Sequence, residues 1–170
     1  FRSIHSINYG ERVHTLRFQI NSLFRQLEEN EYLYDSSLLF AENLGYRTGF
    51  SYPHYIFDPI NNKRFKTLSI APNVMDTTVF EKKYLGFNDE NGFIEIKKFI
   101  KENQLYSGFT SILFHHSFFW FNSNSRINLY KKLLCFIKEN NIASITHKAF
   151  YEWYLENKII ISYDNGKYEN

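Results

Sequence analysis

Short extended segments alternate with amphipathic helical segments along most of this chain, and this order constrains the fold more than any other feature. Strands that are separated by helices pair in parallel, so the alternation favours a mainly parallel sheet or barrel over an antiparallel sandwich. We therefore predict an α/β fold. The expected order is a helix near 20–27, strands near 31–39 and 65–71, a helix near 93–103, a strand at 109–115, a helix at 125–139, a strand at 142–145 and a helix after Thr146.

The segment 109–115 gives the strongest strand pattern. Its residues from Thr110 to Phe114 are apolar nearly throughout, which is typical of a central strand that is covered on both faces. The stretch 41–66 instead contains glycines, prolines and an Asn pair without a sustained period, and it predicts a long loop. Long loops within a domain commonly serve a site, and the Tyr, Phe, His and Arg content of this loop favours a binding role.

The charge of the chain excludes some classes of partner. Twenty basic and 18 acidic residues give a formal net charge of +2 without a basic block, so we predict no nucleic-acid partner. No apolar run reaches the roughly 18–20 residues that span a bilayer, and we predict no membrane span. Cys135 is the only cysteine, which excludes an intramolecular disulfide, and its place in a helical pattern predicts a buried thiol.

Two arginines flank a histidine in the segment 10–18. Strand alternation places Arg12 and His14 on one side of this segment and Arg17 on the other. Inside a cleft, an arginine can hold a carboxylate base in its ionised form through a bidentate pair. A salt bridge at the surface or at the edge of the core is the alternative for these residues.

His115 and Asp76 each follow a predicted strand. Parallel α/β folds place their sites at the carboxyl ends of strands, and a histidine there suits general acid or base catalysis. Adjacent strand residues point to opposite faces, so His115 and His116 are not expected to face one ligand. Asp76 is placed to accept a hydrogen bond from His115. A structural histidine and a helix-capping aspartate are the alternatives, and the two roles of Asp76 can coexist.

Five motifs occur here in the order in which they occur in polysaccharide deacetylases. They are Gly10-x-Arg12-x-His14-x-Leu16-Arg17-Phe18, Tyr34-Asp35-Ser36-Ser37, Gly45-Tyr46-Arg47-x-Gly49-x-Ser51-x-Pro53, Met75-Asp76 and Ile112-Leu113-Phe114-His115. From about Gly10 to Trp153 the sequence resembles the NodB homology domain of carbohydrate esterase family four, particularly its bacterial branch with a long aromatic loop. The resemblance implies a distorted (β/α) barrel.

The resemblance also implies an activity, which is metal-dependent hydrolysis of N-acetyl or O-acetyl groups on a glycan. His115 matches the histidine that protonates the leaving amine, Arg12 matches the arginine that orients the catalytic base, and Asp76 matches the acid that holds the histidine. Arg47, Tyr52 and His54 would line the substrate groove. The implied partner is a polysaccharide or another acetylated glycan.

The metal-binding motifs of that family, an Asp pair and His-x-x-x-His, precede the arginine motif. Only eleven residues precede Arg12 here, and His5 among them has no second histidine four residues away. We therefore expect residues 1–170 to form the C-terminal part of a single domain, a partial barrel without its own ligands for the implied divalent, zinc-like metal and inactive alone. The alternative is a non-catalytic glycan-binding or interaction module derived from the same fold.

Overall fold

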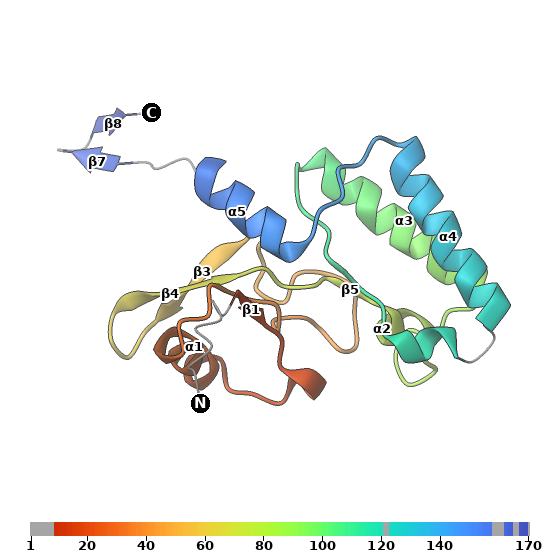
Figure 1. The fold of residues 1–170 in the computed structure, drawn as a ribbon, viewed down its shortest axis with the longest axis horizontal. Coiled ribbons are helices and arrows are strands. Elements are labelled where there is room, and N and C mark those ends of the chain that lie inside the picture. The colour runs from red at the N-terminus through yellow and green to blue at the C-terminus, as the bar shows by residue number, and fades with distance from the viewer. Residues whose placement is uncertain (1–8, 121–122, 158–161, 165–166, 170) are drawn as a thin grey trace, which may run out of the picture.

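Two small sheets with parallel strands form the centre of the computed structural model, which describes residues 9–120, 123–157, 162–164 and 167–169 (Figure 1). The larger sheet has the strand order β1-β2-β4-β3, in which β1 pairs in parallel with β2, β2 in parallel with β4, and β3 antiparallel with β4. Its strands are β1 (Gly10–Glu11), β2 (Tyr34–Asp35), β3 (His54–Asp58) and β4 (Lys63–Ser69).

The smaller sheet continues the path of the chain beyond β4. Its two parallel strands are β5 (Val74–Met75) and β6 (Ile112–Leu113), with Val74 opposite Ile112. Asn73 connects the chain ahead of both strands, because its Oδ1 accepts the backbone N–H of Ser111 at 3.1 Å and its Nδ2 donates to the carbonyl of Phe109 at 3.1 Å. An antiparallel hairpin of β7 (Ser162–Asp164) and β8 (Lys167–Glu169) forms a third, separate sheet.

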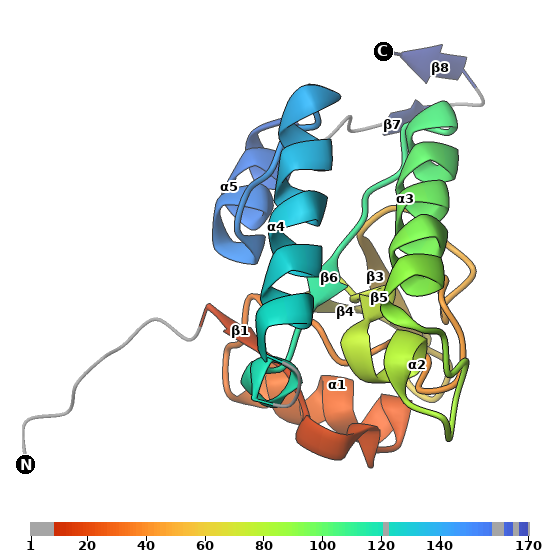
Figure 2. The same cartoon turned by 90° about the vertical axis from the view of Figure 1, so that its right-hand side faces the viewer.

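The helices pack around two hydrophobic clusters (Figures 1 and 2). In the α1 cluster, Leu23, Phe24 and Leu27 of α1 pack with Leu38 and with Phe65 of β4. The α3–α4 cluster joins α2, α3, α4 and η2 to β5, and its largest fully buried members include Ile96 and Leu133. The helical elements are η1 (His14–Leu16), α1 (Ile20–Glu29), α2 (Asp76–Phe80), α3 (Asp89–Leu105), η2 (His116–Phe119), α4 (Ser123–Glu139) and α5 (His147–Asn157).

Close packing between α2 and α3 depends on Gly92. A Cβ atom at this position would lie 2.3 Å from the Phe80 ring and 2.8 Å from Val79. α3 begins at Asp89, directly after its N-cap residue Asn88. The side chain of Asn88 accepts the N–H of Asn91 at 2.8 Å and so caps the helix. The helix expected after Thr146 is also present, and the hydroxyl of Thr146 accepts the N–H of Ala149 at 3.2 Å at the start of α5.

The predicted α/β class is confirmed, but the pairing is mixed rather than mainly parallel, because β3–β4 and β7–β8 are antiparallel, and no barrel is closed among the described residues. The prediction of one loop over 41–66 is wrong, because β3 and the first part of β4 form a hairpin within it. The turn of this hairpin is built by Asp58, whose carboxylate accepts the backbone N–H groups of Ile60 and Asn61. Asn62 adopts a positive φ of 50° there.

The prediction of a central strand over 109–115 is wrong as well. Only Ile112 and Leu113 pair, β6 has a strand neighbour on one side among the described residues, and both side chains are half-buried. The segment 142–145, which was expected to be the next strand, forms no strand.

The predicted burial of Cys135 is likewise wrong. Its side chain is exposed on α4, because the buried face of that helix carries Leu129, Leu133 and Phe136. In the part of the chain that the structure describes, no helix combines the length and apolarity that crossing a membrane requires.

Candidate active site

His115 and Asp76 meet at the carboxyl ends of the two paired strands of the smaller sheet. Asp76 directly follows β5 as the first residue of α2, and His115 lies two residues beyond β6. His115 Nδ1 lies 2.6 Å from Asp76 Oδ1, and the His115 backbone N–H donates to Asp76 Oδ2 at 2.8 Å. The parallel pairing of β5 and β6 therefore produces the contact that the sequence predicted between two residues 39 positions apart.

The hydrogen bonds of Asp76 determine which nitrogen of the imidazole is available. Both carboxylate oxygens already accept backbone N–H groups, from Thr77 at 2.7 Å and from His115 at 2.8 Å. An ionised carboxylate only accepts hydrogen bonds, so Nδ1 of His115 carries the hydrogen that it donates to Asp76. Nε2 of His115 is therefore the nitrogen that can act on a ligand. The side chain of Asp76 is 1% exposed and that of His115 is 24% exposed, so the aspartate is covered while the histidine stays accessible.

His116 has different surroundings from His115. It begins η2 and is exposed, and its ring lies edge-on to Trp120 at a centroid distance of 4.9 Å. The two adjacent histidines therefore make different contacts, His115 with Asp76 and His116 with Trp120. The capping alternative for Asp76 is wrong, because the N-cap of α2 is Met75, which makes no side-chain capping bond. Asp76 is the first residue of the helix and accepts the N–H of Thr77 while it contacts His115.

The segment that carries Arg12 is held to β2 by buried hydrogen bonds. The backbone N–H of Val13 donates to Ser37 Oγ at 2.8 Å, and that hydroxyl donates to Asp35 Oδ1 at 2.6 Å. Arg12 itself is half-buried and makes no hydrogen bond or ion pair with other residues in the described ranges. Its side chain is thus unpaired there, but no contact joins it to His115 or Asp76, so the structure does not bring the three predicted residues into one bonded cluster.

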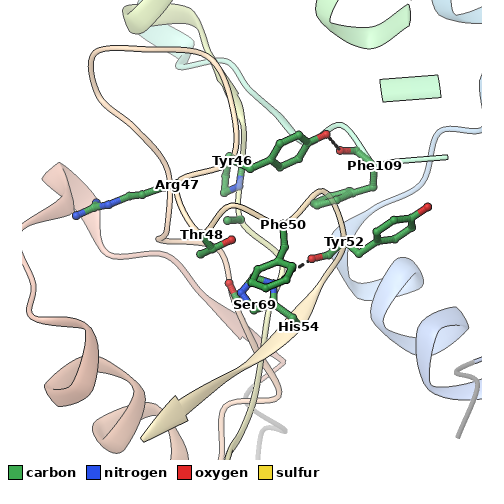
Figure 3. Close-up of a pocket in the computed structure, with 10 residues that line it drawn as sticks. Tyr46, Arg47, Thr48, Phe50, Tyr52, His54, Ser69 and Phe109 are labelled. Atoms are coloured by element: carbon green, nitrogen blue, oxygen red, sulfur yellow. Dashed lines mark hydrogen bonds between the residues drawn. The ribbon is translucent and has the colours of Figure 1, made fainter. Parts of the chain in front are cut away.

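The three predicted groove residues, Arg47, Tyr52 and His54, line one small pocket (Figure 3). Arg47 extends away from the other two, and its Nη1 donates to the carbonyl of Leu39 at 3.3 Å. Tyr52 donates to the carbonyl of Tyr106 at 3.0 Å, and the ring of His54 contacts the carbonyl of Tyr52.

This pocket lies toward the amino end of β6, whereas His115 lies beyond its carboxyl end. Phe109, which precedes β6, lines the pocket, and its N–H donates to the carbonyl of Ser51. His115 lies six positions after Phe109, so the chain between them spans at most about 20 Å. The structure therefore separates the three groove residues from the His115–Asp76 pair.

The sequence analysis did not single out Ser69 or the pair formed by Ser111 and His147. Ser69 is 1% exposed and is one of the residues that line the pocket, and its buried hydroxyl has no hydrogen-bond partner among the described residues. Ser111 Oγ lies 2.7 Å from Nε2 of His147 and connects α5 to the start of β6. Burial lowers the pKa of His147. A serine in a strand pattern and a histidine in a helical pattern give no signal of such pairing.

A metal ion is implied by the resemblance, and the described residues do not fit one. Within the described ranges, no three His, Cys, Asp or Glu side chains are placed to hold a metal ion together. A catalytic zinc site uses three protein ligands. We therefore assign no ligand and derive no chemical step through a metal.

Comparison of the chain with known protein families, curated proteins and solved structures finds no significant match. The fold and the site together define a mixed α/β protein with a histidine–aspartate pair at paired strand ends. The likeness to polysaccharide deacetylases stays a prediction.

Proposed function

We propose that this chain contributes the acid-catalysis half of a glycan deacetylase. The observation that carries the proposal is the Asp76–His115 pair, with its Nδ1–Oδ1 distance of 2.6 Å and its second bond from the His115 backbone N–H. Hydrolysis of an N-acetyl group breaks the bond between the acyl carbon and nitrogen, and a water oxygen becomes bonded to that carbon. The departing nitrogen must take up a proton, which His115 donates from Nε2.

Asp76 acts in this proposal through His115 and is a positioning residue. Its two bonds fix both the ring and the backbone of His115, so the imidazole needs little reorganisation when it meets the substrate. Burial of the carboxylate also excludes water from the side of the ring that faces away from the substrate. Arg12, unpaired among the described residues, is proposed to orient the base of the reaction, as its match in the arginine motif implies.

The proposal requires metal ligands from outside the described residues, because a family enzyme of this kind uses a divalent metal. The substrate class, an acetylated glycan, comes from the order of the five motifs. The partial exposure of the His115 side chain, 24%, supports the proposal, because a proton donor must be reachable by the leaving group.

The test uses protein expressed from the complete reading frame and measures acetate release from N-acetylchitopentaose. His115→Ala is expected to lower kcat by roughly 100-fold or more, the usual contribution of a general acid. His116→Ala is the matched control, because it removes the neighbouring exposed histidine and should leave the rate unchanged. Asp76→Asn should lower kcat with little change in KM. Full turnover by His115→Ala, or no acetate release by the wild type from N-acetylated or O-acetylated glycans, would refute the proposal.

A further inference from the structure

A buried hydroxyl without a partner lies in the pocket at the amino end of β6. Ser69 is the last residue of β4 and is 1% exposed, and its Oγ finds no hydrogen-bond partner among the described residues. A buried polar group without a partner is energetically costly, so a group from outside the chain gains free energy by bonding to it. The cavity has about 10 Å³ of room for the centre of a water-sized sphere, which fits one hydroxyl group and no larger fragment.

Exposed aromatic rings border the same pocket. The ring of Phe50 is 62% exposed and packs against the ring of His54 at a centroid distance of 4.8 Å. His54 pairs with Ser69 across the β3–β4 hairpin, and Phe50, which also lines the pocket, lies against His54 (Figure 3). Tyr52, 51% exposed, borders the pocket on the side of Tyr106. Rings that stay exposed beside a polar cavity suit a ligand with one apolar face and projecting hydroxyl groups.

We infer that this pocket is a glycan-binding site separate from the His115–Asp76 pair. A sugar ring stacks on the exposed face of Phe50, and one of its hydroxyl groups enters the cavity and bonds to Ser69 Oγ. The choice of a glycan as the ligand class rests on the proposed function. The location of the site does not, because it follows from Ser69, Phe50 and the size of the cavity.

Such a site would hold a polymeric substrate at a distance from the reacting group. The pocket lies toward the amino end of β6 and His115 lies beyond its carboxyl end, six positions after Phe109. A polysaccharide could therefore contact both places at once, whereas a single sugar could not. Binding of a polysaccharide at the pocket would raise its effective concentration at the His115–Asp76 pair.

The experiment measures the binding of N-acetylchitopentaose and of cellopentaose by ligand-observed NMR. It uses the full-length protein in a His115→Ala background, so that the ligand is not consumed. Phe50→Ala is expected to weaken binding about tenfold through loss of stacking, and Ser69→Ala about fivefold through loss of one hydrogen bond. Phe57→Ala is the matched control, because Phe57 lies on the same hairpin, is 55% exposed and does not line the pocket.

Binding that weakens in the Phe50 and Ser69 variants but not in the Phe57 variant supports the inference, and cellopentaose binding would show that the acetyl groups are not required. Absence of binding by either oligosaccharide, or equal losses in all three variants, overturns it. The proposed function fails independently of this result, since it depends on acetate release and on the effect of His115→Ala. If the protein binds glycan through Phe50 but releases no acetate, the inferred glycan site stands and the proposed deacetylase activity is refuted.

Discussion

Asp35 is an unusual carboxyl group, because the fold buries it completely at the end of β2. Its oxygens accept the hydroxyl of Ser37 at 2.6 Å and the backbone N–H of Ser37 at 2.9 Å. Both bonds favour the ionised form. Burial outweighs them and raises the pKa of Asp35 to about 6 from the ordinary value of 3.8, and the nearby charge of Glu11 raises it further.

The raised pKa makes the stability of the protein depend on pH. The folded state binds the Asp35 proton more tightly than the unfolded state, so this stabilising contribution is fully present below pH 3.8 and is lost as the pH rises through about 6. The difference of about two pKa units corresponds to roughly 3 kcal/mol. At neutral pH the ionised carboxylate therefore lowers the free energy of unfolding.

Urea unfolding of the wild type and of Asp35→Asn between about pH 4 and about pH 7 measures this effect. Asparagine keeps the shape of the side chain but does not titrate, so the stability of the wild type relative to the variant should fall by roughly 3 kcal/mol across this range. Taking the difference removes the pH dependence of other groups, such as Glu28, whose lowered pKa acts in the opposite direction. Parallel pH profiles for the two proteins would refute the reasoning.

Three further predictions concern packing and α5. Gly92→Ala should destabilise the protein by about 1–3 kcal/mol in urea unfolding, because the added methyl group meets the Phe80 ring. Asn73→Ala should cost a similar ~1–3 kcal/mol, since it removes two hydrogen bonds ahead of β5 and β6, and an unchanged unfolding midpoint would contradict both of these expectations. Burial lowers the pKa of His147, so the contribution of this histidine to the free energy of unfolding is present above pH 6.5 and is lost as the pH falls. Below that pH the wild type should therefore lose more stability than His147→Gln.

The helices at 20–29, 89–105, 123–139 and 147–157 were predictable from the spacing of their apolar residues. The expected helix after Thr146 begins at His147, and the helix expected near 20–27 spans Ile20–Glu29. The contact between His115 and Asp76 was predictable for a related reason: parallel pairing brings the carboxyl ends of strands together, and both residues follow strands.

The remaining features depend on tertiary contacts that periodicity does not encode. The β3–β4 hairpin was hidden by its prolines and by the absence of alternation, although the Asp58-to-Asn62 turn carries a recognisable turn composition. The strand at 109–115 reads as a central one because it is apolar. The number of its neighbours is set by the partners available, and only β5 pairs with it among the described residues. The path of the loop that carries Tyr52 is set by a bond to the carbonyl of Tyr106, a contact across 54 positions.

The division of the interior into two hydrophobic clusters also bears on how the proposed catalytic groups would move. The His115–Asp76 pair is attached to β5, α2 and η2, whose residues pack in the α3–α4 cluster. Arg12 instead adjoins Val13, which packs against the α1 cluster. Units with separate cores can open with different free energies, which amide hydrogen exchange resolves. The alignment of Arg12 with the histidine therefore depends on the contacts that join the two clusters, among them the bond from the Thr78 hydroxyl to the carbonyl of Ala41 and the bond from the Tyr46 hydroxyl to the carbonyl of Phe109.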